Sequence, residues 1–197
     1  MRVMFLRHGQ TRGNLEGRYI GRTDEPLCEA GVAALAARPP LPRPARLYVS
    51  PLRRCRESAA LLFPEEVPVA VADFRECDFG AFEGKNYAEL NGDADYQAWI
   101  DSGGELAFPG GESRASFQDR CCAAFARVAE ALLTEAADGP AAFVVHGGTI
   151  MAILSRYGVP RKGYFDWQVK NGEGFAGELT RAGGELRLEG IVRLPRE

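Results

Sequence analysis

The chain has 197 residues, of which 46% are hydrophobic and 26% are charged, with a formal net charge of −3. This composition is typical of a soluble globular protein with one sizeable core, and it argues against non-specific binding of nucleic acid. Because no apolar run is as long as a membrane-spanning helix and the first residues enter a predicted strand without a leader, we expect a single cytoplasmic domain over residues 1–197 with no membrane partner.

Predicted strands alternate with predicted helices along the chain. Strands are expected over residues 3–6, 46–50, 67–72, 142–145, 175–180 and 186–192. All but the last two of these are apolar without alternation, as in strands buried on both faces, whereas the last two alternate and are expected near a sheet edge. Helices are expected over residues 28–37, after Ser50 and Pro51, over about 113–137, and from after Gly147-Gly148-Thr149 to near Gly158. In the second helix, serine is the expected N-cap and proline lies in the first turn.

This alternation predicts an α/β fold, a three-layer α/β/α sandwich with a mostly parallel central sheet. Residues 79–111 do not follow it, because they are rich in glycine and aromatic residues. We interpret them as an inserted segment with short helices that covers one edge of the sheet. It is either a lid over an active site or a surface excursion. The sequence leaves open whether its aromatic residues contact a ligand: Tyr87, Tyr96, Trp99 and Phe108.

The cysteines and histidines give little support for a disulfide framework or a metal site. There are five cysteines, an odd number, without a Cys-x-x-Cys spacing, so we expect them to be reduced and mostly buried. Cys77 is a possible exception because it adjoins a candidate acid, Glu76. With only two histidines, a metal site would depend on carboxylates, and we expect no metal and no cofactor.

Both histidines follow apolar runs and precede glycine. His8 ends the run over residues 1–7, and His146 ends the run over residues 141–145. Ligands of open α/β sheets bind beyond the carboxyl ends of the strands, so the two imidazoles could share one site. A histidine whose ring is fixed by a neighbour can act as a nucleophile. The alternative is a core histidine beside a surface arginine.

Candidate phosphate-binding arginines lie next to His8 and at the start of the helix after Ser50. Arg7 offers a planar set of donors that suits phosphate oxygens. The helix after Ser50 carries three arginines near its start, where a helix N-terminus also attracts anions, although some of the three must face solvent. They are Arg53, Arg54 and Arg56.

Candidate general acids lie in one short segment, because Glu76, Asp78 and Glu83 all fall within residues 74–84. An imidazole, fixed cations and a carboxylic acid together suit phosphoryl transfer. The glycine-rich loop of P-loop nucleotide hydrolases is absent from the sequence.

The chain resembles the histidine phosphatase superfamily, also called phosphoglycerate mutase-like. Residues 7–11 resemble its Arg-His-Gly-x-Thr signature and residues 50–54 its Ser-x-Leu-x-Arg block. The loop at 18–27, the acid-bearing segment at 76–84 and the second histidine at 145–148 follow the family's order.

The resemblance implies a role for each matching position. His8 would be the nucleophile that forms a phosphohistidine. Glu76 would protonate the leaving oxygen and later activate water. Arg7, Arg54 and His146 would line the phosphate pocket. Substrate contacts are further implied at Asn14, Gly21 and Gly147. No metal is implied.

The length of the chain resembles the phosphatase-type branch of the family more than its mutases, which carry more inserted sequence. Residues 96–99 and 108–113 resemble α-ribazole phosphatase. We therefore expect a metal-independent phosphomonoesterase acting on a small phosphorylated metabolite, with α-ribazole phosphate as a candidate. The alternatives are a phosphoglycerate-type mutase and a non-catalytic module that binds a phosphorylated ligand. The module would be marked by loss of the nucleophile or the acid, and neither is lost.

Overall fold

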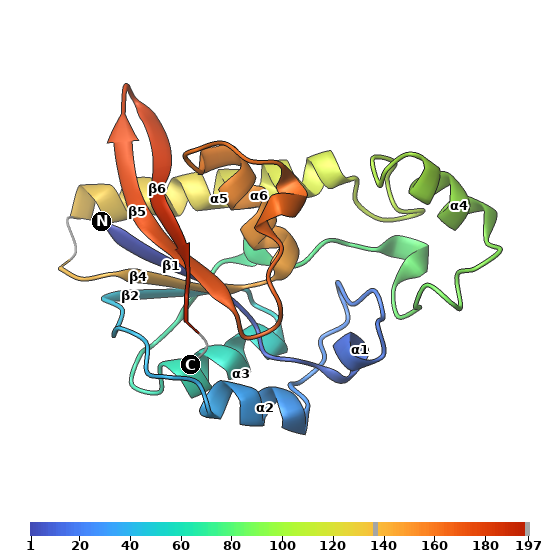
Figure 1. Ribbon diagram of the computed structural model, residues 1–197, viewed down its shortest axis with the longest axis horizontal. Helices are drawn as coiled ribbons and strands as arrows, with labels where there is room; N and C mark the ends of the chain where they lie inside the picture. Colours follow the sequence, from blue (N-terminus) through green and yellow to red (C-terminus); the bar gives the residue numbers. More distant parts are fainter. Residues whose placement is uncertain (136–137, 196–197) are drawn as a thin grey trace.

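A six-stranded sheet forms the centre of the computed structural model, which describes residues 1–135 and 138–195. The strand order is β3-β2-β4-β1-β5-β6, and all of these strands except the short β3 are labelled in Figure 1. The pairs β3–β2, β2–β4 and β4–β1 are parallel. The pairs β1–β5 and β5–β6 are antiparallel. The mostly parallel sheet is therefore confirmed. The bounds are β1 Arg2–Arg7, β2 Arg46–Val49, β3 Val69–Ala70, β4 Ala141–Val145, β5 Gly174–Ala182 and β6 Glu185–Arg193.

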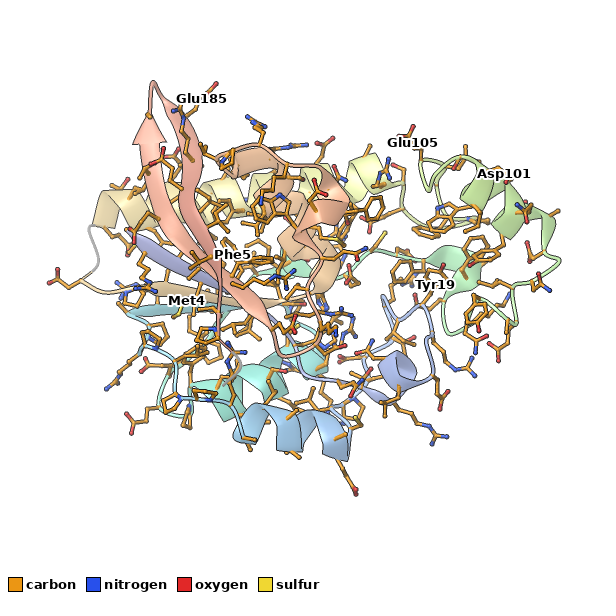
Figure 2. All side chains as sticks on the ribbon, viewed as in Figure 1. Met4, Phe5, Tyr19, Asp101, Glu105 and Glu185 are labelled. Carbon is orange, nitrogen blue, oxygen red and sulfur yellow. The ribbon has the colours of Figure 1, made fainter. Side chains whose placement is uncertain are left out.

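Helices cover both faces of the sheet, which confirms the three-layer arrangement (Figure 1). Helices α5 (Arg114–Glu135) and α6 (Gly147–Tyr157) lie on one face, and α3 (Arg53–Leu62) lies on the other, with α2 (Glu29–Ala36) against it. Because neighbouring side chains of a strand point to opposite faces, Phe5 of β1 packs on α5 while Met4 packs on the α3 side (Figure 2). None of the described helices combines the length and apolar character needed to cross a membrane.

Two details of the sequence prediction are wrong. The strand expected over residues 67–72 is only Val69–Ala70, an edge strand whose side chains are exposed. An apolar run without alternation does not distinguish such an edge from a buried strand. The second helix begins at Arg53, with Leu52 rather than Ser50 as the N-cap residue, so Pro51 also precedes the helix rather than lying in its first turn. The Ser50 hydroxyl lies 2.7 Å from a ring nitrogen of His146 and 3.4 Å from the Leu52 backbone nitrogen.

The other helices lie near their expected positions. Cys28 is the N-cap residue of α2. Helix α6 ends at Tyr157, directly before Gly158, but it begins at Gly147, three residues before the expected start. Helix α5 is described to Glu135, and the expected residues 136 and 137 lie outside the described part of the chain.

The segment over residues 79–111 lies at one end of the molecule, beyond the short helix α1 (Arg12–Leu15) (Figure 1). It contains the 3-10 helix η2 (Gly80–Phe82) and helix α4 (Ala94–Asp101). Its rings pack on one another, as when Phe82 contacts Tyr96 with ring centroids 5.4 Å apart. The segment is therefore a packed unit beside the sheet edge where β1 and β4 end.

Candidate active site

The sheet brings the two histidines together. Strands β1 and β4 are parallel neighbours with Arg7 opposite Val145, so the next residue of each strand lies at the same edge. These residues are His8 and His146, which are 3% and 0% exposed. Their ring centroids are 5.2 Å apart at an interplanar angle of 67°.

The ring of His8 is fixed in one tautomer. Its Nδ1 lies 2.7 Å from the carbonyl oxygen of Gly9, and because a carbonyl only accepts, Nδ1 carries the proton. The Nε2 lone pair is then available for nucleophilic attack. Burial, then the charges of Arg54 and Arg7, hold the pKa of His8 well below its ordinary value of 6.5, so the ring is neutral at pH 7.

The ring of His146 is held by Ser50. The Ser50 Oγ lies 2.7 Å from His146 Nε2, and the Cys55 Sγ lies 3.6 Å from the same nitrogen. Burial, then the Arg54 charge, lowers the pKa of His146 well below 6.5, so this imidazole is also neutral. When Ser50 donates its hydroxyl proton to Nε2, the ring proton lies on Nδ1, which can then donate to a bound anion.

Two arginines supply positive charge at this edge. Arg7 donates from Nη1 to the carbonyl oxygen of Val169 at 2.8 Å, while its buried Nε has no hydrogen-bond partner among the described residues. Arg54, only 1% exposed, donates to the carbonyl oxygens of Thr23 at 2.8 Å and Gly21 at 3.0 Å. A buried guanidinium with unused donor capacity is suited to bind an anion.

Of the helix arginines considered from the sequence, Arg54 is the one that lies at the histidines. Arg53 is directed away and pairs with Glu57 of the same helix at 2.6 Å. The Ser-x-Leu-x-Arg spacing implies that Arg54, rather than Arg53, belongs to the phosphate pocket. In the structure Arg54 is buried, whereas the Arg53 side chain is exposed to solvent.

The candidate acids have different partners. Glu76 lines the same pocket as Arg7, and burial raises its pKa above the ordinary 4.5, which favours the protonated acid. Asp78 pairs with Arg22 at 3.1 Å, and Glu83 accepts from the backbone of Gly21 at 2.9 Å. Glu76 is therefore the carboxyl group best placed to donate a proton.

The remaining residues implied by the resemblance lie around this cluster. Asn14 accepts on Oδ1 from Asn171 at 3.0 Å. Gly21 uses its N–H for Glu83 and its carbonyl for Arg54. A Cβ on Gly147 would lie 3.4 Å from the Arg7 guanidinium carbon. Direct substrate contacts are still a prediction for these three positions: Asn14, Gly21 and Gly147.

Two supporting residues were missed from the sequence. The N–H of Gly9 donates to Ser58 Oγ at 2.9 Å, and Asn171 Nδ2 donates to the His8 carbonyl oxygen at 3.2 Å. Ser58 lies one helical turn after Arg54, a spacing that could have indicated it. Asn171 lies 163 positions from His8, and no local sequence signal connects them.

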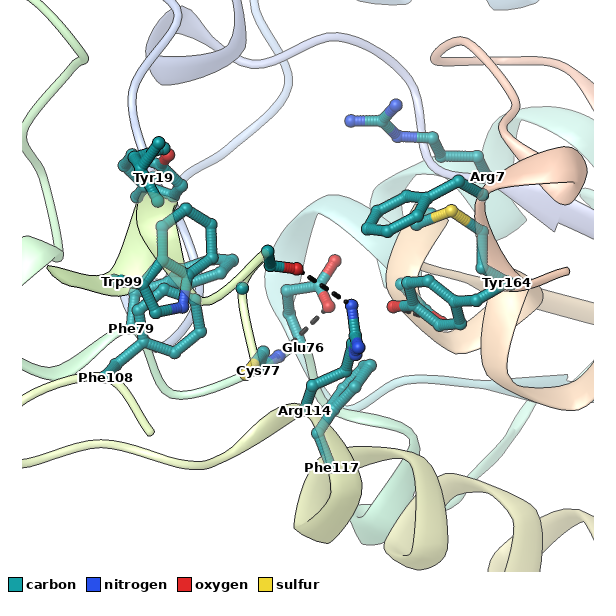
Figure 3. A pocket seen from close by; sticks show the side chains of 17 residues that line it. Arg7, Tyr19, Glu76, Cys77, Phe79, Trp99, Phe108, Arg114, Phe117 and Tyr164 are labelled. Carbon is teal, nitrogen blue, oxygen red and sulfur yellow. Dashed lines mark hydrogen bonds between the residues drawn. The ribbon is translucent and has the colours of Figure 1, made fainter. Parts of the chain in front are cut away.

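A pocket of about 520 Å³ opens from this cluster toward residues 79–111 (Figure 3). Glu76 lies in its middle, with Arg7 and Tyr164 to one side and a group of aromatic rings on the other. The five cysteines are reduced and most are buried. Burial, then the Glu76 charge, raises the pKa of Cys77, which also lines the pocket, so it is an uncharged thiol. Among the described residues, no group of His, Cys, Asp and Glu side chains could hold a metal ion.

The comparison with known families agrees with this geometry. The model of the histidine phosphatase superfamily (branch 1) matches residues 3–190. The chain belongs to this superfamily, and the expectation of a phosphatase-class enzyme is confirmed at that level.

Individual relatives carry different substrate names. A glucosyl-3-phosphoglycerate phosphatase of Mycolicibacterium vanbaalenii is 32% identical over 92% of this chain and 84% of its own. An adenosylcobalamin/alpha-ribazole phosphatase of Escherichia coli is 25% identical over 95% of each chain. A solved structure of a phosphoglycerate mutase from Thermus thermophilus covers 99% of both chains at 31% identity, with a TM-score of 0.69. The names agree on phosphate esters and differ on the rest of the substrate.

Proposed function

We propose that this protein is a phosphomonoesterase that works through a phosphohistidine on His8 and needs no metal. The observation that carries the proposal is the hydrogen bond from His8 Nδ1 to the Gly9 carbonyl oxygen. It leaves Nε2 of a neutral ring unprotonated, at an edge that also presents Arg7 and Arg54. A nucleophile fixed in one tautomer beside preorganised cations is what phosphoryl transfer requires.

The first step transfers the phosphoryl group to the enzyme. His8 Nε2 attacks phosphorus, the bond between phosphorus and the ester oxygen breaks, and the leaving alkoxide takes a proton from Glu76. Arg7, Arg54 and the Nδ1–H of His146 stabilise the negative charge on the phosphoryl oxygens. In the second step the Glu76 carboxylate takes a proton from water, whose oxygen attacks phosphorus, and inorganic phosphate leaves as the bond to His8 breaks.

The substrate is proposed to be a small phosphorylated metabolite. α-Ribazole phosphate is a candidate because residues 96–99 and 108–113 resemble α-ribazole phosphatase and an E. coli relative carries that name. A phosphoglycerate-type mutase is the second candidate, because of the T. thermophilus relative at 31% identity. The cytoplasmic location and the lack of a nucleic-acid partner are still predictions from the sequence.

The test is a product assay combined with labelling. Incubation with a ³²P-labelled ester should give an acid-labile, alkali-stable protein label that is absent from His8→Ala, together with release of inorganic phosphate. Isomerised phosphoglycerate without phosphate release would favour the mutase. Binding of esters without turnover on a broad panel would favour the non-catalytic module. Full turnover by His8→Ala would refute the phosphohistidine route.

A further inference from the structure

The pocket continues from the phosphate end into a wall of aromatic rings. We call Tyr19, Phe79, Trp99 and Phe108 the aromatic wall, and all of them line the pocket (Figure 3). Phe79 and Phe108 have ring centroids 5.0 Å apart, as have Trp99 and Phe108. Tyr19 belongs to the loop after the signature, and its ring packs edge-on to Phe79 at 5.3 Å. The wall is thus built jointly by two segments that are distant in the chain.

The opposite side of the pocket is also apolar and partly open to solvent. It includes Met151 and Tyr164, and Phe165, which is 56% exposed. Ile100, next to Trp99 in α4, lines the pocket and is 47% exposed. Large apolar side chains left exposed around one cavity indicate a surface that an apolar ligand group would cover.

Positive charge is scarce away from the phosphate end. Among the described residues that line the pocket, only Arg7 and Arg114 are cationic. Arg114 is already engaged, because it pairs with Glu105 at 2.8 Å and donates to the Gly103 carbonyl oxygen at 3.2 Å. A leaving group with a carboxylate or a second phosphate would lose water here without gaining an ion partner, which is unfavourable.

We propose that the pocket selects phosphomonoesters of alcohols that carry an aromatic ring, with the phosphate at His8 and the ring against the aromatic wall. The inference rests on the proposed phosphatase activity and adds the class of leaving group. A volume of about 520 Å³ exceeds what a three-carbon acid needs and is within the range of pockets that enclose ring-bearing ligands. Trp99 is the specificity-determining residue at the centre of the wall.

The test compares phosphates of primary alcohols, so that leaving-group chemistry changes little while the attached group changes. The probes are 2-(2-naphthyl)ethyl phosphate, ethyl phosphate and 3-phosphoglycerate. We expect kcat/KM for the naphthyl ester to be about tenfold or more above both others, because burial of the ring adds binding energy. Equal kcat/KM for the naphthyl and ethyl esters, or a higher value for 3-phosphoglycerate, would overturn the inference alone. No turnover of any ester would overturn the proposed function itself.

Substitutions locate the effect in the pocket. Trp99→Ala should lower the ratio of kcat/KM for the naphthyl ester to that for the ethyl ester by about tenfold. Phe165→Ala should lower the same ratio about threefold. Because Phe165 is exposed, this variant can be measured even if Trp99→Ala does not fold. Tyr87→Ala is the matched control, since Tyr87 is a 73% exposed ring of the same segment that is not among the pocket residues. A ratio unchanged in both pocket variants would overturn the inference.

Discussion

The phosphate end and the aromatic wall meet in one pocket, which Arg7 and Glu76 line together with the aromatic rings, but the two regions are built in different ways. At the phosphate end, strand ends and helix starts deliver buried polar side chains, each held by hydrogen bonds, as His8 is by Gly9 and Arg54 by Thr23. The aromatic wall is held by ring packing between residues of three loops and the short helix α4. In the proposed function, the sheet therefore fixes the groups that act on the phosphate, and the inserted segment would contact the rest of the substrate.

The two regions also differ in electrostatics. Burial and neighbouring cations lower the pKa values of His8 and His146, and burial raises that of Glu76. Among the described residues that line the pocket, the one cation besides Arg7 is Arg114, and it is paired with Glu105. Substitutions at the phosphate end should reduce turnover of every ester, whereas substitutions in the wall should change the preference among esters.

Loss of the nucleophile should have the largest effect. His8→Ala is expected to lower kcat by about 10⁴-fold or more for both ethyl and naphthyl esters, because no phosphohistidine can form. Stopped assays of phosphate release measure it, and His8→Gln repeats the test with less loss of packing. A normal circular dichroism spectrum excludes unfolding as the cause. A loss confined to one ester would contradict the division between the two regions.

Removal of the acid should have the next largest effect, and its size should depend on the leaving group. Glu76→Gln keeps the shape of the side chain but has no proton to give. We expect kcat/KM for ethyl phosphate to fall about 10²–10⁴-fold and that for 4-nitrophenyl phosphate to fall much less. Comparable losses on both esters would show that Glu76 is not the proton donor.

Loss of the Ser50 hydroxyl should have an intermediate effect through His146. In Ser50→Ala, Nε2 loses its partner at 2.7 Å, so the ring can place its proton on either nitrogen, and kcat should fall about tenfold. Nitrogen-15 NMR can follow the tautomer directly, because the chain has only two histidines. Ser155→Ala is the control, since its hydroxyl bonds Ala152 within α6. An unchanged His146 spectrum would refute the positioning role.

The pH dependence of kcat/KM should change less than in the preceding variants, and the direction of each change follows from the pKa shifts. His8 must be neutral to attack, and its pKa is lowered below 6.5, so kcat/KM should persist at pH values below 6.5. Glu76 must be protonated, and its pKa is raised above 4.5, so its loss of the proton sets the alkaline limb for poor leaving groups. The Glu76→Gln variant should lack that limb. An acid limb at or above pH 6.5 would contradict the neutral His8.

Much of the phosphate end could be predicted from the sequence, because its residues follow strands and helix starts. Apolar runs that end in histidine placed His8 and His146 at one edge, and the parallel pairing of β1 with β4 brings them within contact. Asn171 could not be found in this way, since a loop distant in the chain delivers it. The length and burial of the edge strand Val69–Ala70 were overestimated, because burial depends on neighbouring strands and helices that the local sequence does not show.

The inserted segment was the harder part to predict, and its rings show why. Their positions depend on packing between Trp99, Phe108 and the distant Tyr19, which no local periodicity encodes. The aromatic composition of residues 79–111 indicated a lid or a surface excursion but could not say which rings face a cavity. The structure separates Trp99, which lines the pocket, from Tyr87, which is exposed.

The smallest predicted effect lies at Asp78, between the two regions. Asp78 is two positions from Glu76, but its carboxylate pairs with Arg22 at 3.1 Å and accepts from the Gly80 N–H at 3.0 Å. Partly exposed pairs of this kind contribute little, so Asp78→Asn should leave kcat/KM for ethyl phosphate within about twofold of the wild-type value. A loss that is larger for ethyl than for 4-nitrophenyl phosphate would instead identify Asp78 as the acid. Because Asp78 and Glu76 are carboxylic side chains of the same loop, and burial raises the pKa of Glu76, this comparison tests whether burial selects the acid.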